Sequence, residues 1–312
     1  MYYANILPDK IILSSGTSTA EIWPAQGAIL NSWKVNLDGE LLDVIDGYTD
    51  ADDFSVNAES KGFRSCKLSP YVCRLNKGEY SYDGRQYHIG KFDLNGSSIH
   101  GLLYDVPFEV LKHEANDHLA MAIVAYQYTG TDKGYPYVYE AVVTYTLINN
   151  KITIGTQITN RHHGTIPLAD GWHPYFKLGG TVNDWTLQMA SKTMVEFNDA
   201  LIPTGALQND ERFTNGQVLG ATKLDNCFLL EKLMGDQPAC TLKHEKAGAQ
   251  LSIFANSHYP YLQVYTPPHR QSIAIENLSA APDAFNNKMG LILLEAGESI
   301  GFSCTYAIGK CE

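Results

Sequence analysis

Positive charge is scarce in this chain and is nowhere gathered into a cluster. Its 312 residues include 23 Lys and Arg against 34 Asp and Glu, which gives a formal net charge of −11. A surface that binds nucleic acid or an anionic membrane needs a patch of basic side chains to attract its ligand. The composition therefore predicts no nucleic-acid or membrane partner and favours a neutral small molecule.

Long apolar runs are missing too. Runs such as GLILL at residues 290–294 are far too short to cross a bilayer. The opening MYYANILPDK lacks the basic and apolar regions that are typical of a secretory signal peptide. We therefore expect a cytoplasmic protein.

The six cysteines include no C-x-x-C pair and no tight Cys/His group of the zinc-site type. We expect free thiols, and we predict neither a metal site nor a cofactor. No linker, repeat or low-complexity tract divides the chain, so we predict one domain over residues 1–312.

Helical periodicity is weak throughout, whereas turn signals between short extended segments are dense. Asp38-Gly39, Asp83-Gly84 and Asn215-Gly216 suit tight hairpin turns, which need a positive φ at their central residues. The clearest hairpin is YVYEAVVTYTLINNKITIGTQITN, in which Asn149-Asn150 separates two alternating segments. These patterns predict an all-β protein, a large antiparallel β-sandwich or barrel.

Histidine is the first residue type to consider for catalysis. Neighbours on a strand point to opposite faces, so His162 and His163 are poorly spaced to share a metal ion. His173 lies between Trp172 and PYF in DGWHPYFKLGG, a setting that suits either a pocket wall or a core histidine with a satisfied hydrogen bond.

Four further polar residues stand in unusual surroundings. His100 precedes a glycine, where the backbone can approach a ligand closely. Arg74 interrupts an apolar stretch and needs either a structural partner or a ligand. Asp225 precedes an apolar strand, and Glu276 ends one, where burial can tune its pKa for proton transfer.

The motifs around these residues resemble, in the same order, those of the aldose 1-epimerases (galactose mutarotases). The matching segments are IHG, HPYFKL, LDNCF and IAIENLSAAPDAFNN, together with GAILNSWKVNLDGELLDVI near the start and LLEAGESIGFSCTYAI near the end. The resemblance covers nearly the whole chain and implies a β-sandwich of the galactose mutarotase type. It also implies a monomer or homodimer that acts on a free aldose without a cofactor.

The resemblance assigns roles position by position. His173 matches the general acid that protonates the ring oxygen O5, and Glu276 matches the general base at the C1 hydroxyl. Arg74, His100 and Asp225 match residues that bind sugar hydroxyls and orient the ring.

The chain also departs from the family pattern. The arginine segment reads SPYVCRL, with Pro70 and Cys73 where family members usually have arginine and asparagine. Pro174 and Lys177 replace the more usual residues beside His173, and there we expect the sugar preference to differ.

Three other functions remain open. A hexose 6-phosphate mutarotase needs basic side chains at the pocket rim, and the chain offers few, among them Lys67, Arg74 and Lys177. A carbohydrate-binding module does not require an acid–base pair. A glycoside hydrolase needs two carboxylates, such as those of Asp225 and Glu276, facing each other across the scissile bond.

Overall fold

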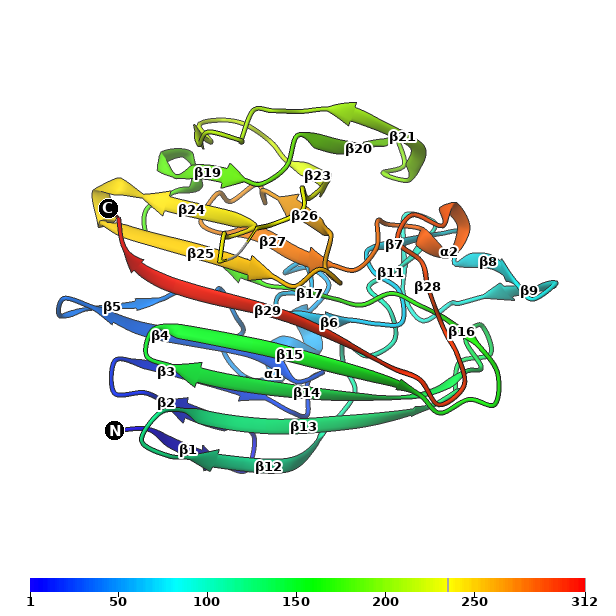
Figure 1. Cartoon of the computed structure of the whole chain (residues 1–312), viewed down its shortest axis with the longest axis horizontal. Helices are drawn as coiled ribbons and strands as arrows, with labels where there is room; N and C mark the ends of the chain where they lie inside the picture. The colour runs from blue at the N-terminus through cyan, green and yellow to red at the C-terminus, as the bar shows by residue number, and fades with distance from the viewer. Residues whose placement is uncertain (235, 312) are drawn as a thin grey trace.

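The computed structural model describes residues 1–234 and 236–311 and consists mainly of β-strands in two facing layers (Figure 1). A nine-stranded sheet forms the front layer in this view. Its order is β12 (Glu109–Ala115), β13 (Ala120–Thr129), β14 (Val138–Ile148), β15 (Lys151–Asn160), β29 (Ser299–Lys310), β25 (Ala249–Ala255), β24 (Cys240–His244), β19 (Thr186–Met189) and β22 (Gln217–Val218).

Two sheets lie behind it. The first has the order β1 (Tyr3–Ile6), β2 (Ile11–Ser14), β3 (Ser18–Trp23), β4 (Ile29–Leu37) and β5 (Glu40–Asp43). The second has the order β21 (Pro203–Asn209), β20 (Thr193–Phe197), β23 (Asp225–Leu229), β26 (Tyr261–Tyr265), β27 (Ile273–Leu278), β17 (Gly171–His173) and β6 (Cys66–Leu68), and β18 (Tyr175–Phe176) pairs with β27. The predicted antiparallel β-sandwich is confirmed.

Shorter elements complete the fold. The small sheets are β10 (Asp93–Leu94), β11 (Ser97–Ile99) and β7 (Arg74–Asn76); β16 (Ile166–Leu168) and β28 (Ile292–Leu294); and β8 (Glu79–Tyr82) and β9 (Arg85–His88). The helices of the described residues are α1 (Ala51–Asn57), α2 (Ala284–Asn287) and the 3-10 turns η1 (Val182–Asp184) and η2 (Glu245–Ala247). None of these is long and apolar enough to traverse a lipid bilayer.

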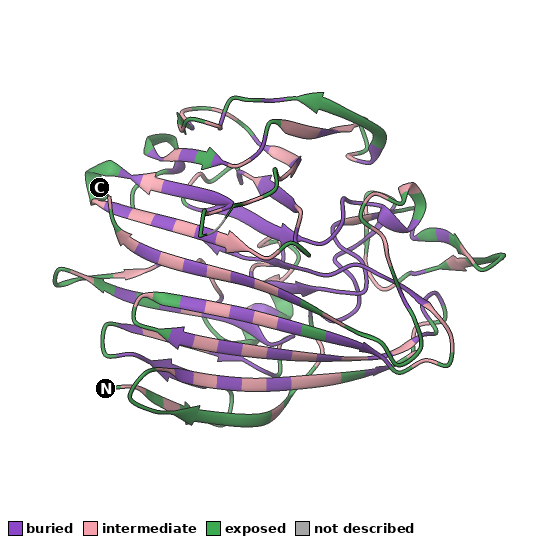
Figure 2. Ribbon diagram, in the orientation of Figure 1, coloured by how far each residue is buried: buried purple, intermediate pink, exposed green. Residues whose placement is uncertain are grey.

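The main core fills the space between the layers. Buried and partly exposed residues alternate along β14 and β15, which appear as striped ribbons in Figure 2. The alternation expected for this segment is confirmed, and Tyr139 and Tyr145 on its inner face are fully buried. The Tyr145 ring contacts Trp172 of β17 at 6.2 Å between centroids, which joins the front layer to the rear one.

The turn predictions hold with one exception. Asp38, Asp83 and Asn149 have positive φ values and connect paired antiparallel strands, as predicted. The Asn215-Gly216 hairpin is wrong: the neighbouring strands β21 and β22 belong to different sheets. Asn-Gly favours a tight turn locally, but strand pairing depends on which partners the core brings together.

Register across the rear sheet determines which side chains share its outer face. Glu276 on β27 lies opposite Gln263 on β26, which in turn lies opposite Cys227 on β23. Successive strand residues point to opposite faces. Ile275 therefore points into the main core, and Glu276 points away from it.

Candidate active site

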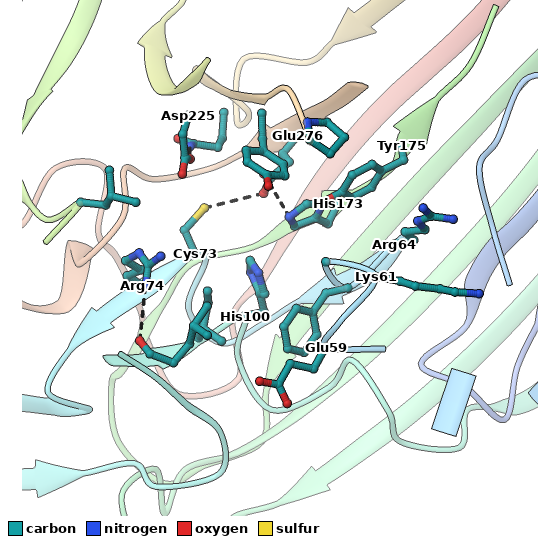
Figure 3. Close-up of a pocket in the computed structure, with 18 of the residues that line it drawn as sticks. Glu59, Lys61, Arg64, Cys73, Arg74, His100, His173, Tyr175, Asp225 and Glu276 are labelled. Carbon is teal, nitrogen blue, oxygen red and sulfur yellow. Dashed lines mark hydrogen bonds and ion pairs between the residues drawn. The ribbon is translucent and has the colours of Figure 1, made fainter. Parts of the chain in front are cut away.

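An open cavity of about 540 Å³ lies on the outer face of the rear sheet. All five residues singled out from the sequence line it: His173, Glu276, Arg74, His100 and Asp225 (Figure 3). They come from segments separated by up to 202 positions in the chain (74 to 276). His173, Glu276 and Asp225 come together because β17, β27, β26 and β23 are successive neighbours in one sheet. Arg74 on β7 and His100, which follows β11, come from the small sheet of β10, β11 and β7.

His173 and Glu276 form a close polar pair in the cavity. The imidazole Nε2 lies 3.2 Å from Glu276 Oε1, within hydrogen-bond reach. His173 is 5% exposed and Glu276 is 2% exposed. A proton can therefore pass directly between the two groups, and bulk water has little access to either.

Burial shifts both groups toward their neutral forms. Burial raises the pKa of Glu276 well above its usual range, and the charge of Asp225 adds to this rise. Burial also lowers the pKa of His173 to about 4. Burial therefore favours a pair that carries one mobile proton, held on the carboxyl group.

A strained turn positions His100 beside this pair. His100 and Gly101 have φ values of 64° and 77°, and a Cβ at Gly101 would lie 2.3 Å from the Ser69 carbonyl oxygen. The His100 ring meets the His173 ring edge-on at 4.9 Å. Burial lowers the pKa of His100 well below its usual range, and the charges of His173 and Arg74 lower it further. His100 is therefore neutral and can both donate and accept hydrogen bonds.

Asp225 and Arg74 lie on the far side of Glu276 from His173 (Figure 3). Burial raises the pKa of Asp225, although the positive charge of Arg74 opposes the rise. Among the residues that the structure describes, the Arg74 guanidinium has one hydrogen bond, from Nη1 to the Leu94 carbonyl oxygen at 3.3 Å. Its remaining donors leave it suited to bind hydroxyl groups in the cavity.

Gln263 is a site residue that the sequence reasoning missed. Its amide donates to Asp225 Oδ1 at 2.8 Å, and it lies directly opposite Glu276 in the sheet. The available signal was a polar residue within the otherwise apolar strand YLQVY. That signal becomes interpretable only once the register with β27 is known.

Aromatic and charged side chains close the other wall. The Tyr175 ring stacks on His173 at 5.2 Å and an interplanar angle of 8°. The Arg64 guanidinium carbon lies 5.7 Å from the centre of the Tyr175 ring, and Arg64 pairs with Asp46 at 2.8 Å. These contacts restrain the His173 ring in one orientation.

Three residues lie elsewhere than expected. Lys67 is fully buried and pairs with Asp170, so it is not at the cavity rim. Pro174 and Lys177 do not line the cavity either. Pro174 accepts a backbone hydrogen bond from β27, and Lys177 donates one to Val44. The two substitutions beside His173 therefore lie outside the cavity lining, although we expected them to influence the sugar preference.

The two histidines that follow β15 lie in another part of the molecule. His162 and His163 line a different cavity with Tyr82 and Tyr137. They lie just after Asn160, the last residue of β15.

Comparisons with solved structures define the fold. A galactose mutarotase-like protein from Clostridium acetobutylicum superposes with a TM-score of 0.87 at 17% identity, covering 100% of this chain and 99% of that one. The GalM/aldose epimerase homologue from C. elegans gives 0.83 at 22% identity, covering 99% and 100%. The chain therefore has the galactose mutarotase-like fold, as expected from the resemblance.

Sequence comparisons identify the family. YihR of Escherichia coli K12, an uncharacterised protein, is 29% identical over 240 residues, which cover 74% of each chain. Human galactose mutarotase is 23% identical over 213 residues, covering 62% of this chain and 59% of the human protein. The aldose 1-epimerase family profile matches residues 9–307. The chain belongs to the aldose 1-epimerase family.

Proposed function

We propose that this protein is a mutarotase that interconverts the α and β anomers of a free aldose, with His173 as general acid and Glu276 as general base. The observation that carries the proposal is the 3.2 Å contact between these two side chains on the floor of an open cavity. Ring opening moves two protons at the two oxygens of one carbon, and an adjacent carboxylate and imidazole supply both movements.

The reaction starts when the sugar stabilises the ionic form of the pair. The C1 hydroxyl donates to the Glu276 carboxylate, and O5 accepts from protonated His173. Glu276 takes the hydroxyl proton, the C1–O5 bond breaks, and His173 protonates O5. The products are the open aldehyde, neutral His173 and protonated Glu276. Rotation about C1–C2 followed by the reverse transfers yields the other anomer.

Arg74, His100 and Asp225 bind the sugar hydroxyls in this proposal. Their task is orientation, because both proton transfers need hydrogen-bond distances of roughly 2.6–3.2 Å. The pair regenerates itself over one cycle, so the proposed reaction needs no cofactor. We further propose that the chain acts as a single domain over residues 1–312, in the cytoplasm, as a monomer or homodimer.

The charges of the cavity wall favour a neutral sugar over a sugar phosphate. Lys61 is paired with Asp53 at 2.6 Å, and Arg64 is paired with Asp46 at 2.8 Å. A phosphate bound there would compete with these carboxylates. The alternatives of a sugar 6-phosphate substrate, a binding module and a glycoside hydrolase are outcomes of the test below.

The test is anomer exchange followed by polarimetry or NMR. Freshly dissolved α-D-glucose and α-D-galactose should equilibrate faster with the protein than without it. Glu276→Gln and His173→Asn should each reduce the acceleration about 10²–10⁴-fold while the circular dichroism spectrum stays unchanged. Glu196→Gln is the matched control, because Glu196 lies on β20 and does not line the cavity.

A panel of free aldoses, their 6-phosphates and aryl glycosides separates the alternatives. Acceleration confined to the phosphates, or release of the aryl group, would replace the proposal with the corresponding alternative. Binding without acceleration of any sugar would identify a binding module.

A further inference from the structure

The thiol of Cys73 contacts the carboxyl group to which we assign the role of general base. Its Sγ lies 3.6 Å from Glu276 Oε2, within reach of an S–H donor (Figure 3). Cys73 lines the cavity, is 7% exposed and has a φ of 49°. The proposed mechanism does not use this contact.

The two oxygens of Glu276 face different partners. Oε1 faces His173 Nε2, and Oε2 faces the Cys73 thiol. In the part of the chain that the structure describes, the thiol is the single hydrogen-bond donor to Oε2. Cys73 belongs to a small apolar cluster with Val72, Cys227 and Leu278, so no other polar group compensates the carboxylate from that side.

We propose that Cys73 is a positioning residue for Glu276. Its S–H group holds Oε2, which directs Oε1 toward His173 and the sugar, and it stabilises the carboxylate that accepts the C1 hydroxyl proton. This inference rests on the proposed function for its kinetic consequences, whereas the hydrogen bond itself can be tested without activity.

A thiol suits this position because it is a weak hydrogen-bond donor. A carboxylate that accepts strong hydrogen bonds is a poor base, because those bonds hold it in the ionised form. A thiol is a weak donor and a small apolar group. It can fix the orientation of the carboxyl group and leave it basic enough to take a proton from a sugar hydroxyl.

The kinetic test compares Cys73→Ala, Cys73→Ser and the control Cys227→Ala across a pH series. Cys227 is a buried thiol of the same cluster, two strands from β27, without a hydrogen bond to Glu276. Loss of a hydrogen bond of ordinary strength should lower kcat/KM of Cys73→Ala about two- to tenfold.

The pH profile distinguishes positioning from packing. Without the S–H donor the carboxylate is less stable, so the alkaline limb of kcat/KM should move to higher pH in Cys73→Ala. Cys73→Ser keeps a donor and should leave the limb at or below its wild-type position. Equal profiles for Cys73→Ala and Cys227→Ala would overturn the proposal.

Infrared spectroscopy tests the contact independently of turnover. The S–H stretch of Cys73, taken from the wild type minus Cys73→Ala difference, should lie at lower frequency than that of Cys227, obtained from wild type minus Cys227→Ala. Coincident bands would overturn the inference even if the protein is a mutarotase. A lowered Cys73 band in a protein without mutarotase activity would refute only the proposed function.

Discussion

Lys67→Met removes one half of a buried ion pair beneath the proposed active site. The Lys67 ammonium lies 2.5 Å from Asp170 Oδ1, and both side chains are fully buried. Lys67 is on β6, and Asp170 immediately precedes β17, the strand that ends in His173. The pair therefore joins the two strands at the base of the cavity, and Tyr259 adds a hydrogen bond to Asp170.

The cost of this substitution comes from the carboxylate that it leaves behind. Methionine fills a similar volume, so the packing loss is small. Breaking a buried pair by removing one partner costs about 3–5 kcal/mol. At about 2.1 cal/mol/K per residue, unfolding of the 312-residue chain has an entropy of roughly 0.66 kcal/mol/K, so the melting temperature should fall by roughly 5–8 °C.

The loss of stability in Lys67→Met should increase as the pH rises. Burial raises the pKa of Asp170, and in the wild type Lys67 opposes that rise. In the variant the positive charge is gone and only the Tyr259 hydrogen bond opposes the rise. Folded Asp170 therefore keeps a proton that the unfolded chain releases above its ordinary pKa of about 3.9. Stability then decreases as the pH rises through this window. The deficit relative to wild type should be largest at pH 8 and smaller at pH 5.

Calorimetric melts at both pH values provide the measurement. The control Lys67→Met/Asp170→Asn has no buried charge, and its asparagine can still accept from Tyr259, so it should regain much of the lost stability. A single variant that melts within about 1 °C of wild type would refute the reasoning. So would a double variant that is no more stable than the single one at pH 8.

Three further predictions concern the cavity itself. Gly101→Ala forces a side chain against the Ser69 carbonyl, so it should lower the free energy of unfolding by roughly 2–4 kcal/mol and raise KM for the sugar. The control is Gly96→Ala, at a position that also has a positive φ but open space around it. This control should lower the free energy of unfolding by about 1 kcal/mol and leave KM unchanged. The acid limb of wild-type kcat/KM should fall near the His173 pKa of about 4 rather than near 6.5, and an acid limb at pH 6 or above would contradict this. Glu276→Gln should raise the melting temperature above that of the wild type at pH 8 but not at pH 4. The reason is that a carboxyl group whose pKa is raised in the folded state makes the folded protein less stable as the pH rises. Equal melting temperatures of variant and wild type at pH 8 would contradict this.

Local sequence patterns predicted much of the fold. The period-two alternation and the Asn149-Asn150 turn are enough to define the β14–β15 hairpin, because both its register and its buried face are local properties. Pairing between distant segments is not local. β29 lies between β15 and β25, and no pattern within any of these strands specifies that neighbour.

The active site was likewise predictable only in part from the sequence. The resemblance named His173 and Glu276, but it could not show that their side chains lie 3.2 Å apart. Gln263 and the contact of Cys73 with Glu276 depend on sheet register. Lys67 was misplaced because a lysine in a sequence suggests an exposed charge, whereas the buried partner that accommodates it is 103 positions away.

The position of Pro174 and Lys177 outside the cavity lining also has a physical reason. Pro174 stands between His173 and Tyr175, which both line the cavity, so alternation directs Pro174 to the other face. Lys177 lies beyond the end of β18, where its N–H donates to the Val44 carbonyl. The cavity wall comes instead from residues 59–64, where Arg64 covers Tyr175. Differences in sugar preference should therefore follow this segment, because it contacts the ring that stacks on His173 while leaving the acid–base pair intact.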